Sequence, residues 1–382
     1  MEKPRTRVAR IVTLASVTGK YGGPTDTALR QAELLNRDDY RVKVIAGALP
    51  GDEPSSSQLH TAPVRPWVPT GDFTAVFSLK LANLIVRAVT GSHVVHVSMA
   101  RELTPIFACV VALLARKPLV VQPHGMLTAR TSLAHKLVDF FVRPLVRAAD
   151  VVVALTDVER RALECWMGGR RLPTFSTIGN PSPTIDRHDR SAPATAFFAA
   201  RLHSRKRVGD FLEAARISLA NGVDVTFVVA GPDQGELEIV QSAAASAKNV
   251  VYLGALTPFE VDRSLASASV FVLPSRDEPW GNVLATAIKA RIPVVVTRSA
   301  AIAPEVQRLG AGIVVADESP DEIAEAVCQL IKRAPAIGEV EAVEIEARFG
   351  NEGIGKALSD AYEFALNREH CSSAVSTRSS GA

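Results

Sequence analysis

Four cationic side chains crowd into one short segment in the second half of the chain, where they could hold a phosphorylated ligand. Residues 197 to 207 begin as a predicted strand and carry Arg201, Arg205, Lys206 and Arg207. Arginine grips a diphosphate with paired hydrogen bonds and lysine meets it as a point charge, so cations at the end of a strand suit that group. A solvated basic loop is the alternative interpretation.

A carboxylate followed by a helix start forms a second candidate, within residues 271 to 296. A buried strand is predicted to end at Pro274, and Asp277 and Glu278 come shortly before a helix. Glu278 can accept hydrogen bonds from sugar hydroxyls, while the first amides of the helix offer its positive end to a phosphate. Asp277 or Glu278 could instead simply cap the helix. The amides concerned are those of Gly281, Asn282 and Val283.

Two loops in the first half of the chain could also face a ligand. Gly22 and Gly23 lie between the first predicted strand and helix, where missing side chains let backbone N–H groups approach a phosphate. A tight turn explains these glycines about as well. His124, beside Gly125, directly follows a strand, and ligands bind at the carboxyl ends of strands in open α/β sheets. We therefore interpret His124 as a cleft residue, although a lone histidine is more often structural.

Strands and helices alternate along the first half of the chain. A loop rich in Pro, Gly and Ser is predicted to extend to Pro69, with a helix near 73–89 and a longer helix over 132–147. Alternation with helices of about a dozen residues indicates a parallel sheet covered on both faces. The predicted strands are Val8–Ser16, Arg41–Ala46, Val94–Ser98, Leu119–Gln122 and Val151–Leu155.

The second half repeats this alternation after a segment without periodicity. Residues 179 to 195 are crowded with Pro, Ser, Asp and Arg, which indicates an interdomain linker. A last helix is predicted over 354–366, and the polar tail after it is predicted to be disordered. The predicted strands are Ala196–Ala200, Asp224–Ala230, Val250–Leu253, Val270–Pro274, Val294–Thr297 and Gly312–Val315.

Length and composition set the broad class. The chain has 382 residues, of which 47% are apolar and 22% charged, so we expect a globular protein with two domains. A net charge of +3 does not suggest a nucleic-acid partner. The excess of basic residues lies in the first 190 positions, which could meet an anionic membrane surface or an acidic glycan, or could be solvated surface charge.

The cysteine spacing, the N-terminus and the lack of a dinucleotide-binding motif argue against several classes of protein. The four cysteines form no CxxC pair and no zinc-type spacing, so we expect a reducing compartment and no bound metal. The N-terminus does not resemble a signal peptide, and the apolar run from 105 to 115 is too short to span a bilayer. No GxGxxG follows a predicted strand, which makes a nicotinamide enzyme improbable. We expect a cytoplasmic protein, with a peripheral position at the inner face of the membrane as an option.

These blocks, in this order, resemble retaining glycosyltransferases of family 4, which have the GT-B fold, and the resemblance covers nearly the whole chain. It rests on the Gly22–Gly23 loop, the PHGML segment around His124 and the pattern from Arg201 to Lys206. Later blocks add to it, namely VAGP at 229–232, VVYLG at 250–254, SRDEPWG at 275–281, and Glu305 before the glycines at 310 and 312.

The resemblance implies an α/β protein in which two doubly wound Rossmann-like domains face a central cleft. It implies transfer of a hexose from a nucleotide diphosphate donor to a glycan or lipid-linked acceptor with retained anomeric configuration, without metal or cofactor. His124 and Glu278 would be the catalytic residues, because His124 would face the transferred sugar and Glu278 would bind its hydroxyls. The donor-binding residues would be Gly22, Gly23, Arg201, Lys206, Gly281, Asn282, Val283 and Thr286.

Thr286 departs from the pattern of the family, which has a second glutamate eight positions after Glu278. That glutamate holds the ribose, whereas Thr286 is uncharged and could give at best one neutral hydrogen bond, worth about 0.5–1.5 kcal/mol. An active enzyme in cell-surface polysaccharide or glycolipid synthesis is our leading hypothesis. A catalytically inactive binding partner with the same fold is the alternative, and a GT-B sugar epimerase would need an acid/base site that we do not find.

The resemblance also implies a domain plan and leaves the acceptor open. We expect an acceptor-side domain over 1–182, a nucleotide-sugar-binding domain over 192–345, and a tail over 371–382. The helix over 350–367 would pack back on the first domain. The helix over 132–147 carries Arg143, Arg147 and Lys136 beside a strongly apolar side, with Arg130 just before it. Such a basic amphipathic helix could rest on anionic lipid, or it could be a core helix with a polar outer face.

Overall fold

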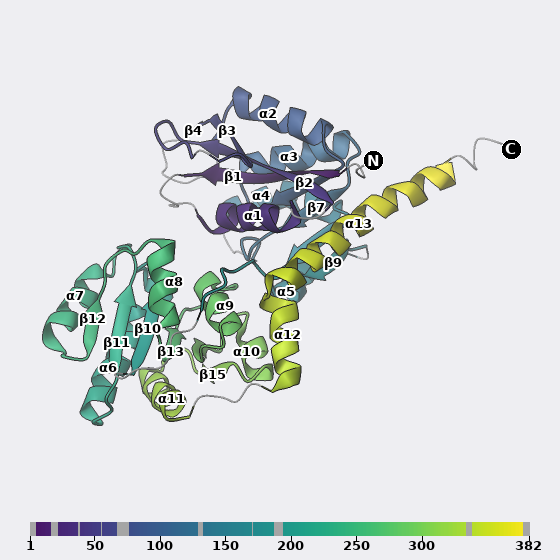
Figure 1. Ribbon diagram of the computed structural model, residues 1–382. Coiled ribbons are helices and arrows are strands. Elements are labelled where there is room, and N and C mark those ends of the chain that lie inside the picture. Colours follow the sequence, from purple (N-terminus) through teal and green to yellow (C-terminus); the bar gives the residue numbers. More distant parts are fainter. Residues whose placement is uncertain are drawn as a thin grey trace. The chain divides into compact units, whose positions relative to one another are not determined.

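The computed structural model describes residues 5–16, 22–36, 39–54, 56–66, 76–128, 133–169, 171–186, 194–333 and 338–376. These residues form two compact units, each built around one large parallel sheet (Figure 1). The first unit comprises Met1–Pro181 and Asn351–Ala382, and the second comprises Ser182–Gly350. The parallel sheets confirm the predicted α/β class.

Seven strands form the sheet of the first unit, in the order β3-β2-β1-β6-β7-β8-β9. All of these neighbours are parallel. The carboxyl ends of the strands therefore meet at one edge, where open α/β sheets bind ligands. The strands are β1 Thr6–Ala15, β2 Tyr40–Ala48, β3 Leu59–Pro63, β6 Val94–Ser98, β7 Leu119–Gln122, β8 Val151–Ala154 and β9 Thr174–Thr177.

Apolar side chains cover both faces of this sheet, as the β-branched runs of its strands require. One core contains residues of α2 (Leu79–Thr90), α3 (Leu103–Leu114), α4 (Leu133–Arg147) and α5 (Asp157–Met167). The other core contains residues of α1 (Gly22–Leu35) and of the C-terminal helix α13 (Asn351–Ser376), drawn in yellow in Figure 1. Ile354, Leu358 and Tyr362 of α13 are fully buried there, so the end of the chain belongs to the first unit.

The second unit has six parallel strands in the order β12-β11-β10-β13-β14-β15. The strands are β10 Thr195–Ala199, β11 Thr226–Ala230, β12 Val250–Tyr252, β13 Val270–Leu273, β14 Val294–Thr297 and β15 Gly312–Val315. The helices are α6 Val208–Ala220, α7 Leu237–Ser246, α8 Pro258–Ala266, α9 Asn282–Lys289, α10 Ala303–Arg308, α11 Pro320–Lys332 and α12 Glu339–Phe349.

The structure corrects several local predictions. The segment predicted as a loop up to Pro69 contains β3, which needs few apolar residues because it is an edge strand paired only with β2. It also contains β4 (Arg65–Pro66), which pairs with β5 (Val76–Phe77). The next helix starts later than predicted, at Leu79, because the Ser78 side chain caps it by accepting from the Leu81 amide. Five further elements were not predicted from the sequence, namely α5, β9, α10, α11 and α12.

The tail prediction also needs correction. The C-terminal helix continues to Ser376, so residues 371–376 are helical rather than disordered. A helix that is already nucleated on packed residues extends at low cost, because each further residue adds one hydrogen bond. Residues 377–382 lie outside the described residues.

Candidate functional site

Two loops at the carboxyl edge of the second sheet carry the predicted cations and Glu278. The first follows β10 and ends in a 3₁₀ turn at Ser204–Lys206, and the second connects β13 to α9. Because β10 and β13 are adjacent and parallel, both loops leave the same edge. A backbone hydrogen bond of 2.9 Å from the Arg276 amide to the Arg205 carbonyl oxygen joins them.

The side chains of Lys206 and Glu278 form an ion pair between these two loops. The Lys206 side chain is 17% exposed and that of Glu278 is 8% exposed. A pair so far removed from water interacts more strongly than a surface pair, and each charge depends on the other because neither is fully hydrated. The structure thus brings one predicted donor-binding cation and one predicted catalytic carboxylate into direct contact.

The remaining cations of the cluster differ in their partners. Arg207 contacts both carboxylate oxygens of Asp210 at 2.8 Å, so its charge is used at the start of α6. Arg201 and Arg205 are exposed. Within the described ranges Arg201 makes no ion pair, which leaves its guanidinium able to meet an anion from solution.

The start of α9 depends on Gly281. This residue occupies the N-cap position with φ 74°, and a Cβ there would lie 3.1 Å from side-chain atoms of both Leu273 and Leu284. Glu278 is paired with Lys206 instead, and Asp277 contacts Ser299 through its backbone amide. The interpretation that Asp277 or Glu278 caps the helix is therefore wrong. The first turn of α9 itself contains no acidic residue, and the amides of Asn282 and Val283 lie at the positive end of this helix.

Thr286 points its hydroxyl back into its own helix. Its Oγ1 donates to the Asn282 carbonyl oxygen at 3.0 Å, and the residue is only 3% exposed. Such a bond to the preceding turn is a common use of a threonine inside a helix. The hydroxyl proton is therefore already engaged within α9.

An aromatic contact holds the Glu278 loop against the end of the second unit. Trp280 is buried and stacks on Phe349 of α12 with a centroid distance of 5.3 Å, and the Arg348 guanidinium lies 4.9 Å from the Trp280 ring. Arg348 in turn bonds both carboxylate oxygens of Glu305 at 3.0 Å. Glu305, one of the residues that carried the resemblance, therefore supports this loop from within the unit.

Arg10 is a buried cation beneath the carboxyl edge of the first sheet, and the sequence analysis missed it. It is fully buried in β1 on the same face as Val8 and Val12, the face covered by α1 and α13. Its side chain donates to the side-chain oxygens of Gln31 at 3.2 Å and Gln122 at 3.1 Å. No Asp or Glu pairs with it in the described part of the chain. Burial lowers the pKa of Arg10 to about 10, so it is still charged at neutral pH.

His124 lies directly beside this cation. Its Nε2 is 3.1 Å from the Ser98 hydroxyl and 3.5 Å from Arg10 Nη2. Burial, and then the charge of Arg10, hold the pKa of His124 well below 6.5, although the Asn180 side chain acts in the opposite direction. The imidazole is therefore neutral at physiological pH.

The backbone around His124 is held in an unusual conformation. His124 has φ 53° and Gly125 has φ 76°, both in the left-handed region. Glu159 fixes the turn, because its carboxylate accepts from the Gly125 amide at 2.5 Å and from the Leu155 amide at 2.6 Å. The carboxylate is buried, which raises its pKa. The spacing of Thr156 and Glu159, typical of a helix start after a strand, was the available signal for this positioning residue.

The glycines of the first loop are only partly described. Helix α1 starts at Gly22, and residues 17–21 before it lie outside the described residues. A Cβ added at Gly23 would meet nothing within 4 Å. Packing therefore does not require a glycine at position 23, which leaves close approach of a ligand as a reason for it.

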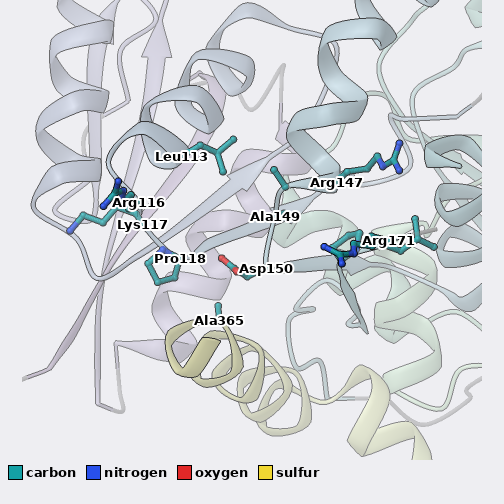
Figure 2. A pocket seen from close by; sticks show the side chains of 12 residues that line it. Leu113, Arg116, Lys117, Pro118, Arg147, Ala149, Asp150, Arg171 and Ala365 are labelled. Carbon is teal, nitrogen blue, oxygen red and sulfur yellow. The ribbon is translucent and has the colours of Figure 1, made fainter. Parts of the chain in front are cut away.

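A pocket of about 450 Å³ lies at the opposite edge of the first sheet (Figure 2). Its lining residues Pro118, Asp150 and Pro173 directly precede β7, β8 and β9, so it opens at the amino ends of these strands. Four of its lining side chains are cationic, and none is a predicted site residue. They are Arg116, Lys117, Arg147 and Arg171.

The described residues hold neither a candidate metal cluster nor a candidate membrane span. They contain no group of three or more His, Cys, Asp or Glu side chains that could hold a metal ion. None of their helices is long and apolar enough to cross a membrane.

Comparison with known proteins defines the class. Sucrose-phosphate synthase from Thermosynechococcus elongatus has a similar fold, with a TM-score of 0.71 and 16% identity, covering 94% of this chain and 98% of that chain. The fold is therefore GT-B, as the resemblance implied. Residues 22–175 match the family described as Glycosyl transferase 4-like domain, and residues 193–333 match Glycosyl transferases group 1. The two matches together cover most of the chain, which therefore belongs to the group 1, 4-like glycosyltransferases that these models describe.

Two curated relatives have similar sequences, and their names give different transferred sugars. One is a GDP-mannose-dependent monoacylated alpha-(1-6)-phosphatidylinositol monomannoside mannosyltransferase of Corynebacterium glutamicum, 26% identical over 171 residues, which are 42% of this chain and 45% of that protein. The other is the alpha-D-kanosaminyltransferase of Streptomyces kanamyceticus, 25% identical over 236 residues, 56% of this chain and 61% of that protein. The chain thus spans about half the length of the curated relatives it matches.

Proposed function

We propose that the protein transfers a hexose from a nucleoside diphosphate donor to a glycan or lipid-linked acceptor with retention of configuration, in the synthesis of a cell-surface polysaccharide or glycolipid. The ion pair of Lys206 and Glu278 beside the start of α9 is the observation that carries this proposal. It supplies a cation for a diphosphate and a carboxylate for sugar hydroxyls within one contact.

The transfer step requires mainly the stabilisation of negative charge on the departing diphosphate. The bond between the anomeric carbon and the diphosphate oxygen breaks, a bond to the acceptor oxygen forms on the same face, and the acceptor hydroxyl passes its proton to the departing diphosphate. Negative charge grows on the departing diphosphate, and prearranged cations and helix amides are the groups that stabilise it. In this proposal Arg201, Lys206 and the start of α9 hold the diphosphate, and Glu278 binds the sugar. We also propose that His124 acts on the sugar as a neutral hydrogen-bonding group.

The acceptor and the location stay proposals as well. The mannosyltransferase relative is named for a phosphatidylinositol glycolipid, whereas the name of the kanosaminyltransferase gives only the sugar that it transfers, so the relatives do not fix the acceptor class. We favour a lipid-linked acceptor, used at the cytoplasmic face of a membrane. Two observations support this choice: the excess of basic residues in the first 190 positions, and the exposed apolar side chains of α4.

Thermal unfolding with a panel of nucleoside diphosphates and nucleotide sugars tests the donor site first. A ligand at 100 times its dissociation constant stabilises the folded state by about 2.7 kcal/mol. We expect a shift selective for one base, lost in Lys206→Ala and retained in Lys248→Ala. Lys248 is a matched control because it is an exposed lysine of the same unit just before β12, at the opposite edge of the sheet.

A cooperative melt that no nucleotide shifts would overturn the donor site. Thr286, with its hydroxyl engaged inside α9, would then favour the inactive binding partner. A selective shift without release of nucleoside diphosphate, in the presence of extracted lipid and glycan acceptors, would favour the same alternative. Release of sugar-modified acceptor supports the proposal, and NMR of the new anomeric proton reports retention.

A further inference from the structure

Helix α4 presents its apolar side chains to solvent. Leu133, Leu137, Phe140 and Phe141 are 83%, 65%, 73% and 59% exposed, and they include both phenylalanines of the helix. A helix on the surface of a soluble domain usually has the opposite arrangement, with the apolar stripe facing the core. The interpretation of this segment as a core helix with a polar outer face is therefore wrong for these four residues.

The orientation of α4 is fixed by a charged residue that points inward. Asp139 is 2% exposed and pairs with Arg101, whose Nε lies 2.6 Å from Asp139 Oδ1. The Trp166 indole N–H donates to Asp139 Oδ2 at 3.0 Å. Val142 and Val146, on the same side of the helix, are fully buried. Rotating α4 to hide its phenylalanines would expose these valines and break a buried ion pair, which is strongly destabilising.

Cations flank the exposed apolar face on one side. With about 100° of rotation per residue, Lys136, Arg143 and Arg147 fall on one line beside the stripe of leucines and phenylalanines. All three cations are exposed. Arg147 also lines the pocket at the amino edge of the sheet, together with Arg116, Lys117 and Arg171 (Figure 2). The first 190 residues carry 25 basic and 16 acidic residues, so the surrounding field is positive as well.

We propose that this face of α4 docks on the surface of an anionic phospholipid bilayer, with Leu133, Leu137, Phe140 and Phe141 inserted at the boundary between headgroups and acyl chains. Exposed aromatic and leucine side chains beside a row of cations are what an interfacial helix needs. The 15 residues of α4 are too few to span a bilayer, which fits a helix that lies in the interface. The inference rests on the proposed function, because docking would bring the sheet edge with His124 to a lipid-linked acceptor.

Flotation with lipid vesicles tests the docking. Vesicles of phosphatidylcholine with 30% phosphatidylglycerol, a composition of about one anionic lipid in three, should carry the protein at low salt. Vesicles of phosphatidylcholine alone should carry at least tenfold less. The double variant Phe140→Ser/Phe141→Ser should lose more than tenfold of the binding, and Lys136→Glu should lose several-fold. Phe259→Ser is the matched control, since Phe259 is 77% exposed on α8 of the other unit.

Two results of the flotation experiment would contradict the proposal that α4 docks on a bilayer. Unchanged binding of the double variant, or equal binding to both vesicles, would overturn it. A dimer in analytical ultracentrifugation that the double variant dissociates would assign this face to a second copy of the chain and also overturn it. The donor-induced thermal shift should be the same in the double variant as in the unmodified protein, which shows that the variant folds. Loss of docking with a retained donor shift would leave the proposed function standing, whereas loss of the shift in both proteins would refute the function alone.

Discussion

The two sheets keep a cation near their carboxyl edges in different ways. In the first unit Arg10 is fully buried among neutral partners, and it lies against the neutral ring of His124. In the second unit Lys206 is partly exposed and paired with the carboxylate of Glu278. A buried cation with neutral partners is a fixed part of the core, whereas a paired cation at the edge can exchange its partner for a ligand. We therefore expect the first network to set the geometry and protonation of His124 and the second pair to take part in donor chemistry.

The largest effect should follow from removing the paired cation. Lys206→Ala should lower donor turnover by about 100-fold to 1,000-fold, the range found when one prearranged group that stabilises transition-state charge is removed. It should also destabilise the second unit, because Glu278 would stay buried without its partner. Initial rates of nucleoside diphosphate release check this, with Lys248→Ala as the control. A loss of less than threefold would show that the pair is structural.

Removing the buried cation of the first unit should have a smaller effect of a different kind. Arg10→Met should lower turnover by about tenfold, the rate change produced by about 1.4 kcal/mol, because His124 loses a charged neighbour and Gln122 loses a donor. The pKa of His124 should rise, since Arg10 is one of the causes that lower it. NMR titration of the imidazole proton measures that pKa. Affinity for the donor should not change, and Arg7→Met, at an exposed arginine of the same strand, is the control.

Affinity for the donor could instead fall as much as turnover in Arg10→Met. The expectation that Arg10 sets the geometry of His124 while the Lys206–Glu278 pair takes part in donor chemistry would then be wrong. An unchanged pKa of His124 would show that Arg10 does not influence the ring through its charge.

The pH dependence of stability should also separate the two units. Burial holds the pKa values of His96 and His124 well below 6.5 in the folded protein. Between the folded and unfolded pKa values the unfolded chain binds more protons, so the free energy of unfolding falls as the pH drops below about 6.5. Both histidines belong to the first unit, so its unfolding should respond to pH between 7.5 and 5.5, an interval of about two units that includes the unfolded value.

Tryptophan fluorescence can report each unit by itself. The variant Trp280→Phe leaves tryptophans at positions 67 and 166 of the first unit, and replacing those two leaves Trp280 in the second. Denaturant unfolding followed with each protein gives the two responses. Equal pH dependence of both transitions would contradict the assignment to the buried histidines.

The smallest effect should come from Thr286→Ala. The hydroxyl of Thr286 is engaged with the Asn282 carbonyl oxygen and the residue is buried, so its removal should change donor affinity by less than about threefold, or less than roughly 0.7 kcal/mol. Calorimetric titration with the nucleotide that gives the largest thermal shift measures this. A loss of donor affinity of tenfold or more would mean that the Thr286 side chain rotates to bind the ribose. Thr286 would then contribute to donor binding together with Lys206 and Glu278.

The sequence indicated which residues lie at the edge of the second sheet because each of them comes shortly after a strand. Arg201 and Lys206 follow one strand and Glu278 follows its neighbour, so the order of strands and loops was enough to expect them at one edge. Their direct contact was not predictable, because the conformation of two irregular loops decides it. From the sequence alone, Glu278 could also have been a helix cap. The observed ion pair with Lys206 excludes that role.

The network beneath the first edge was beyond sequence reasoning. Arg10 bonds Gln122, 112 positions away, and the His96 ring contacts the Tyr362 hydroxyl at 2.8 Å across 266 positions. An arginine in the middle of a β-branched strand indicates an unusual environment, but the partners of Arg10 come from three other elements. The strand at Leu59–Pro63 was missed for a related reason, since an edge strand is specified by its neighbour more than by its own residues.

The sequence by itself determined the alternation of strands and helices, the ends of the strands where ligand-binding residues gather, and the family to which the blocks belong. These features follow from local periodicity and from residues placed at fixed offsets after a strand. Tertiary structure alone decided two things: which charges pair, and that α4 turns its apolar side outward. An amphipathic pattern defines two faces of a helix but does not say which one is buried. That choice came from Asp139, whose ion pair with Arg101 exists only when the chain is folded.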